Sequence, residues 1–177
     1  MFKKIAFLAT SVLALTTTTQ AVAADSLLER INNKGTITVG TEGTYAPFTY
    51  HDASGKLTGY DVEVTRAVGE KLGVTIEFKE TQWDAMLAGL KAGRFDLVAN
   101  QVALTTPERQ ATFDKTEPYS WSGAMMLVRK DDGSIKSLDD VKGRKAAQTL
   151  SSNYGELATK LQADIVPIDG MAQGLLL

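Results

Sequence analysis

The sequence TIEFKETQWDAMLAGLKAGRFDLVAN, residues 75–100, carries the clearest indication of a fold class. Its first six residues alternate between polar and apolar side chains, which is the period of a β-strand. Four apolar residues then recur at the helical spacing i, i+3, i+4 and i+7: Trp83, Met86, Leu87 and Leu90. Gly93 stands at the C-cap position, and the run FDLVAN predicts a second strand. This order predicts a βαβ unit with parallel strands.

The residues before this unit continue the same alternation. Ser26 and Glu29 form a capping-box pattern, and Gly35 ends the helix that they begin. Ile37 and Val39 then lie in a short predicted strand, which runs into the glycine-containing loop GTEGTYAPF. A helix followed by a strand is therefore expected at the start of the domain.

A turn-rich connection, HDASGKLTG, links that loop to the next helix. Residues 61–72 predict a helix whose inner face carries Val62, Val68 and Leu72. Strands that alternate with helices in this way indicate the α/β class, with a mostly parallel sheet flanked by helices.

A second α/β unit is expected to begin near residue 124. Its predicted elements are a strand at 124–128, a short helix in SLDDVKG, a strand in RKAAQTL, a helix in SSNYGELATKLQ capped by Ser151 or Ser152, and a strand in ADIVPID. The chain stops within the apolar segment MAQGLLL. We therefore expect a C-terminally truncated chain with an incomplete second unit.

Three loops follow the predicted strands of the first unit. They are GTEGTYAPF, TQWDAM and NQVALTTPER, in chain order. Because ligands gather at the carboxyl ends of parallel strands, these loops are expected to converge on a binding site.

Residues 1–24 have the composition of a secretory signal peptide. Two lysines precede an apolar run over residues 5–15, and small residues place cleavage after Ala23 or Ala24. The run is too short to span a bilayer as a helix, which takes about 20 residues. The mature chain is therefore expected to be exported and soluble.

The composition narrows the partners of the mature chain. The mature chain has no cysteine, so an ordinary hydrophobic core must stabilise it. In the full sequence, 44% of the residues are hydrophobic. Without the first 24 residues, 17 basic residues stand against 21 acidic ones, a net charge of −4. Nucleic acid is therefore not an expected partner.

The sequence offers little for catalysis, metals or cofactors. The one histidine, His51, lies in a polar turn, and no cysteine accompanies it. A zinc site or a nucleophile with a histidine base has almost no residues to use. The glycines form no phosphate-binding loop with its lysine. We predict no catalytic residue, no metal and no cofactor.

Arg109 is the strongest candidate for binding. Thr106 fits an N-cap and Pro107 the first helical position, which puts Arg109 in the first turn of a helix at the sheet edge. A guanidinium there can bind a carboxylate through two parallel hydrogen bonds. From spacing alone, an ion pair with Glu108 or Asp114 is an equal alternative.

Aromatic side chains in the neighbouring loops can form an apolar wall. Tyr45, Phe48 and Trp83 are the candidates, although Trp83 also begins an apolar helical stripe and fits a core position. Ser152 lies at a predicted helix N-terminus in the second unit, where capping is the alternative to anion binding.

The chain resembles the extracellular solute-binding proteins, family 3, of polar amino acid ABC transporters. GYDVEVTRAVGEKL, residues 59–72, matches the family signature, and GTITVGTEGTYAPFTY, WDAMLAGLKAGRFDLVANQV, PERQATFDKTEPYSWSG and SLDDVKGRKAAQ follow the family's order. The resemblance covers residues 25–177 and is greatest for the cystine-binding branch. It implies a type II periplasmic binding protein clamshell that closes over a free amino acid.

The resemblance also implies how the ligand carboxylate is held. Arg109 would bind it, with help from the main chain near Ala103 and from Ser152 of the second lobe. The connection ALTTPER is one residue longer than usual, so either Ala103 or Thr105 fills the role beside the arginine. Ser151 also stands where the family has a glycine.

The rest of the implied site comes from the first lobe. The carbonyl of Gln101 would accept from the α-ammonium group, Tyr45 and Trp83 would flank the side chain, and Glu42 would line the pocket. A family aspartate that pairs with the α-ammonium would follow Leu177, so we expect the present chain to bind its amino acid poorly.

The resemblance further implies lobe boundaries and partners. Residues 25–123 would form the first lobe, 124–128 a hinge strand and 129–177 part of the second. The protein would act in the periplasm as a monomer and deliver its ligand to an inner-membrane permease. Which amino acid it binds stays open, with cystine favoured.

Two alternatives remain. A periplasmic cyclohexadienyl or arogenate dehydratase would use the same clamshell, with Glu42 as the available base. The extracellular domain of a sensor would require a membrane segment after Leu177.

Overall fold

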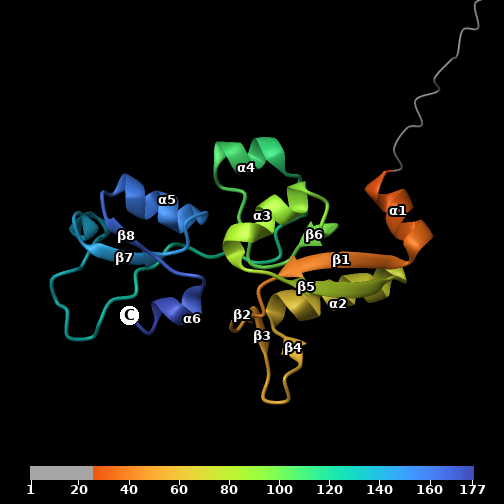
Figure 1. Ribbon diagram of the computed structural model, residues 1–177, viewed down its shortest axis with the longest axis horizontal. Helices are drawn as coiled ribbons and strands as arrows, with labels where there is room; N and C mark the ends of the chain where they lie inside the picture. The colour runs from red at the N-terminus through yellow and green to blue at the C-terminus, as the bar shows by residue number, and fades with distance from the viewer. Residues whose placement is uncertain (1–25) are drawn as a thin grey trace, which may run out of the picture.

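The computed structural model describes residues 26–177 and contains two α/β units (Figure 1). The predicted signal peptide lies outside the described residues. The first unit runs from α1 (Leu27–Lys34) to α4 (Pro107–Thr112), and the second unit from the 3-10 helix η1 (Leu138–Val141) to α6 (Met171–Gly174). Within residues 26–177, no helix has the length and apolar character needed to cross a bilayer.

The main sheet of the first unit is parallel, with the strand order β5-β1-β6. Strand β1 (Thr36–Thr41) pairs along its whole length with β5 (Thr75–Glu80) and at two residues with β6 (Leu97–Val98). The predicted βαβ unit is confirmed, although β6 is shorter than the run FDLVAN because only two residues pair with β1. Val39, at the centre of β1, is fully buried in the core.

The four helices of the first unit agree closely with the sequence patterns. They are α1 (Leu27–Lys34), α2 (Tyr60–Leu72), α3 (Trp83–Lys91) and α4 (Pro107–Thr112). The capping box of Ser26 and Glu29 is formed, and Gly35 ends α1 in the left-handed conformation. Gly93 is also left-handed but follows the C-cap residue of α3 by one position.

The buried face of α2 differs from the prediction. Val62 is fully buried as expected, but Val68 and Leu72 are 47% and 55% exposed. The helix packs through Thr65 and Gly69 instead, because Gly69 lies so close to Ile76 that a Cβ there would be 2.5 Å from its Cγ1. A small residue permits the close approach, so a glycine rather than the large apolar side chains marks the contact face.

A small antiparallel sheet follows β1. It contains β2 (Thr44–Tyr45), β3 (Thr49–His51) and β4 (Leu57–Thr58), in that order. The turn-rich segment is the loop of the hairpin between β3 and β4, where Asp52 accepts hydrogen bonds from Ser54 and Lys56. Strands of two or three residues are too short to give a period, so the sequence did not predict them.

Between residues 138 and 167 the second unit has the predicted order of elements, and the helix α6 that follows was not predicted. It contains η1 (Leu138–Val141), β7 (Lys145–Gln148), α5 (Asn153–Lys160), β8 (Asp164–Pro167) and α6 (Met171–Gly174), and β7 pairs with β8 in parallel. Ser152, not Ser151, caps α5. Figure 1 shows α6 beside β2, and the two elements are in contact. The second unit therefore packs against the loops at the end of β1.

The predicted strand at residues 124–128 is not formed. These residues are exposed and pair with no strand among the described residues, and Met125 is 94% exposed. Because a β-strand requires a hydrogen-bonded neighbour, an apolar sequence alone does not produce one. The segment joins the two units without regular secondary structure.

Replacing Met86 by Ala tests the core of the first unit. Met86 is fully buried on α3. We expect Met86→Ala to lower the free energy of unfolding by about 2–5 kcal/mol, because the change leaves a cavity. Met125→Ala is the matched control at a 94% exposed methionine and should change it by less than about 0.5 kcal/mol. Equal effects in denaturant titrations would contradict this core assignment.

Candidate functional site

Arg109 lies where the sequence predicts, in the first turn of α4. Thr106 caps the helix by accepting from the backbone N–H of Arg109 at 3.3 Å, and Pro107 is the first helical residue. The side chain is only 5% exposed. Its Nη1 donates to the carbonyl of Ala103 at 3.0 Å, and its Nη2 donates to the carbonyl of Ser151 at 2.7 Å. The guanidinium thus connects the first unit to the second.

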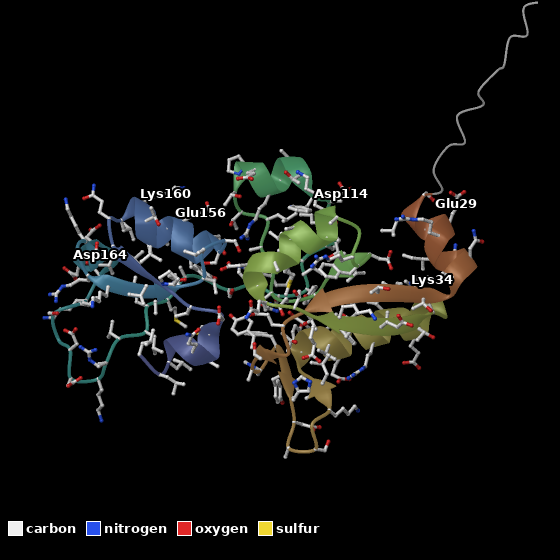
Figure 2. All side chains as sticks on the ribbon, viewed as in Figure 1. Glu29, Lys34, Asp114, Glu156, Lys160 and Asp164 are labelled. Carbon is white, nitrogen blue, oxygen red and sulfur yellow. The ribbon has the colours of Figure 1, made fainter. Side chains whose placement is uncertain are left out.

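The charge of Arg109 has no carboxylate partner among the described residues. The ion pair with Glu108 or Asp114 that spacing allowed is not formed. Burial lowers the pKa of Arg109, while the charges of Glu156 and Glu108 partly offset this effect. Glu156 belongs to α5 of the second unit (Figure 2). A buried guanidinium whose hydrogen-bond acceptors among the described residues are all backbone carbonyls is a favourable place for an anion.

Trp83 stands beside this guanidinium. The Cζ atom of Arg109 lies 5.7 Å from the centre of the Trp83 ring, within the range of a cation–π interaction. The Nε1 atom of Trp83 is buried and has no hydrogen-bond acceptor among the described residues. Trp83 is therefore part of the wall around Arg109 as well as the first residue of α3.

Gln101 is held in an unusual backbone conformation by Asp61. Its φ of 51° lies in the left-handed region, which is uncommon for a residue other than glycine. The fully buried Asp61 accepts from the backbone N–H of Gln101 at 2.6 Å and from its Nε2 at 2.7 Å. Burial raises the pKa of Asp61, and hydrogen bonds from Gln101 and Tyr119 partly offset the rise.

This clamp leaves the carbonyl oxygen of Gln101 without a donor among the described residues. The oxygen is thus available to an N–H group from outside the chain. Asp61 comes from the signature segment at the start of α2, so the signature positions the loop that follows β6.

Glu42 and Tyr45 lie in the loop after β1. The side chain of Asn100 donates to Glu42 Oε2 at 2.7 Å and accepts from the Glu42 backbone N–H at 2.8 Å. Burial raises the pKa of Glu42, the bond from Asn100 lowers it, and the charge of Asp84 raises it. The Tyr45 ring packs on Phe48 with centroids 5.1 Å apart. Asn100 therefore fixes the loop that carries Glu42.

Three expected site residues have clearly different positions. Ala103 presents its carbonyl oxygen to Arg109, whereas Thr105 is exposed and its side chain makes no hydrogen bond among the described residues. Ser152 is buried, accepts from Gly155 N–H at 2.8 Å and donates to the Thr149 carbonyl at 3.2 Å. Its hydroxyl is thus engaged within the second unit as a helix cap.

A cavity of about 370 Å³ lies between the units, beside the loop that carries Glu42. The first unit lines it with Glu42, Thr44, Thr81 and Gln82, and the second with Asp169, Gly170, Ala172 and Gln173. Arg109, Tyr45 and Trp83 are not among its lining residues, although Glu42 is. The first two of the three loops expected to converge line this cavity, and Asn100 of the third loop is hydrogen-bonded to Glu42, but Arg109 does not line the open space.

Four residues of this region were missed as contributors by the sequence patterns: Asp61, Asp84, Asn100 and Ser151. Asn100 follows the last residue of β6 by two positions, directly after the buried Ala99, and a polar residue at that place is a usable signal. Asp61 stands in the signature segment. Trp83 rather than its neighbour Asp84 was the candidate at the start of α3. Ser151 was considered only as a possible helix cap and as a departure from the family glycine. Their partners lie 40 to 67 residues away in the sequence, which local patterns do not reveal.

A comparison with protein families finds one match over residues 37–169, to the bacterial extracellular solute-binding proteins, family 3. The chain belongs to this family. The match includes β1, the signature helix α2, Arg109 and most of the second unit. The resemblance read from the sequence is thereby confirmed.

Curated members of the family support the cystine-binding branch. The chain is 53% identical over 146 residues to the L-cystine-binding protein TcyA of Bacillus subtilis, covering 82% of this chain and 54% of that protein. Three curated relatives, TcyA among them, are covered over 52–59% of their length. The chain therefore spans little more than half of these proteins.

Two solved structures give the fold. The L-cystine solute receptor of Neisseria gonorrhoeae, in its unliganded open conformation, is 73% identical, with a TM-score of 0.54 over 86% of this chain and 64% of that one. The ancestral amino acid-binding protein AncCDT-1, a precursor of cyclohexadienyl dehydratase, is 35% identical, with a TM-score of 0.79 over 85% and 68%. The fold is that of a type II periplasmic binding protein. The more identical structure, an open one, superposes less well.

Asp61→Asn tests the clamp on Gln101. The amide of the new side chain would present an N–H group to the two donors of Gln101, which bind a carboxylate in the wild type. We therefore expect the free energy of unfolding to fall by about 1–3 kcal/mol. Glu63→Gln is the matched control on the same helix, where the carboxylate forms an exposed pair with Arg66. It should cost less than about 0.5 kcal/mol. An Asp61→Asn protein as stable as the wild type in urea titrations would refute the clamp.

Proposed function

We propose that the intact protein captures a free polar amino acid outside the cytoplasm and delivers it to an ABC permease. One observation carries this proposal: Arg109 is a buried cation without a carboxylate partner among the described residues, at the meeting point of two units. A zwitterionic ligand supplies the missing anion through its α-carboxylate. The free carbonyl of Gln101 suits the α-ammonium group.

We propose cystine, or another polar amino acid of similar size, as the ligand. Relatives named for L-cystine include TcyA of Bacillus subtilis and the receptor of Neisseria gonorrhoeae. Cystine carries two carboxylates and two ammonium groups, and Glu42 and Asp169 in the adjoining cavity are acids that suit a second ammonium group. Tyr45 and Trp83 would flank the ligand, and either Ala103 or Thr105 would assist Arg109.

The cellular setting is part of the same proposal. Residues 1–24 would direct export and be removed, so that the protein works in the periplasm as a monomer with an inner-membrane permease as its partner. Residues 25–123 would act as one lobe and 129–177 as part of the other, with 124–128 between them. Ser152 would support the carboxylate site from the N-terminus of α5, which it caps. No nucleic acid and no cofactor would take part.

The proposed role is binding without catalysis. The dehydratase alternative requires Glu42 to act as a base that removes a proton from the substrate. The named relatives are transport-binding proteins. Absorbance assays with prephenate and arogenate separate the two, because only the enzyme would form an aromatic product.

Arg109→Met in the intact protein tests the site. Loss of the guanidinium removes charge-assisted hydrogen bonds of about 3 kcal/mol, so L-cystine should bind about 100-fold more weakly in calorimetry. Arg94→Met, at an exposed position just after α3, is the control and should bind as the wild type does. Unchanged affinity of Arg109→Met would overturn the proposal, and tight binding of glutamine, histidine or arginine instead would replace cystine as the ligand.

A further inference from the structure

A second interaction between the units centres on Asp84, in the first turn of α3. Its Oδ1 accepts from the Ser151 backbone N–H at 2.8 Å and from the Ser151 hydroxyl at 2.6 Å. Its Oδ2 accepts from the Leu150 backbone N–H at 3.2 Å. One carboxylate of the first unit thus receives three hydrogen bonds from the loop that precedes α5 in the second unit.

The carboxylate is charged in this arrangement. Burial raises the pKa of Asp84, but the hydrogen bonds from Ser151 and Leu150 outweigh that effect and leave the pKa below its ordinary value. Hydrogen bonds to an ionised acceptor are stronger than neutral ones. Because Asp84 is exposed, solvent weakens each of them, and the three act together as a contact of moderate strength.

Ser151 is held from two sides. Asp84 binds its N–H and hydroxyl, while the guanidinium of Arg109 binds its carbonyl oxygen at 2.7 Å. A ligand carboxylate at Arg109 would compete with that carbonyl. The contact to Asp84 uses different atoms of Ser151 and does not compete.

We propose that Asp84 is a positioning residue that keeps residues 149–152 of the second unit docked on the first while Arg109 binds the ligand carboxylate. The role of the ligand rests on the proposed function, but the docking does not. The Ser151 hydroxyl makes the shortest of the three bonds, so this side chain is a specific part of the contact. Asp84 thereby sets how long the two units stay docked.

The first test is a distance measurement on the intact protein without ligand. The described sequence contains no cysteine, so spin labels at Lys71→Cys on α2 and Lys160→Cys on α5 (Figure 2) report the separation of the units. We expect Asp84→Ala and Ser151→Gly each to shift the distance distribution to longer values. Distributions identical to the wild type in both variants would overturn the proposal.

A matched control distinguishes docking from loss of any surface carboxylate. Asp52 accepts from the Ser54 N–H at 2.8 Å, the Ser54 hydroxyl at 2.6 Å and the Lys56 N–H at 3.0 Å, all within one hairpin of the first unit. Asp52→Ala therefore removes the same kinds of bond without affecting the contact between units. It should leave the label distance unchanged, and a shift as large as that of Asp84→Ala would overturn the proposal.

The second test measures L-cystine kinetics by stopped flow. If Asp84 holds the closed arrangement, Asp84→Ala should raise the dissociation rate about tenfold and change the association rate much less. Combining it with Ser151→Gly should raise the dissociation rate little further, because both substitutions weaken the same contact between Asp84 and Ser151. Additive effects, or an unchanged dissociation rate, would overturn the docking role. A wild-type protein that binds no cystine refutes the proposed ligand and leaves the distance test intact.

Discussion

The buried guanidinium of Arg109 forms hydrogen bonds with both units of the structure. A charge that is 5% exposed is costly to keep unless polar groups surround it. Here the carbonyls of Ala103 and Ser151 and the face of Trp83 provide them, and these groups come from α3, from the loop before α4 and from the second unit. The position of α4 at the sheet edge and the packing of the units therefore have a common origin.

The sheet of the first unit brings the other groups of the site to the same edge. Parallel strands end together, so the loop with Glu42, the start of α3 and the loop with Gln101 are neighbours although they are far apart in sequence. Asp61 and Asn100 then fix two of these loops by side-chain hydrogen bonds. A site prepared in this way loses little conformational freedom when a small zwitterion binds.

Much of the fold could be predicted because it depends on local signals. The capping box at Ser26, the period of α3 and the N-cap before Arg109 all act within one or two turns of helix. The prediction that Val68 and Leu72 lie on the inner face of α2 was wrong, because a glycine rather than a large apolar side chain makes the close contact. The prediction of a strand at 124–128 was wrong, because a strand needs a hydrogen-bonded neighbouring strand and the described residues do not supply one.

The candidate site was predicted in its residue types more than in its contacts. Arg109 contacts Trp83 and the carbonyl of Ala103 within the first unit, but the contacts of Asp84 and Ser151 arise only when two units meet. We propose that the Arg109 guanidinium binds a ligand carboxylate, and a crystal structure of the intact protein with L-cystine would test this. We expect a carboxylate of the ligand to accept hydrogen bonds from the Arg109 guanidinium in place of a backbone carbonyl. Cystine bound elsewhere, with both carbonyl contacts of Arg109 intact, would contradict it.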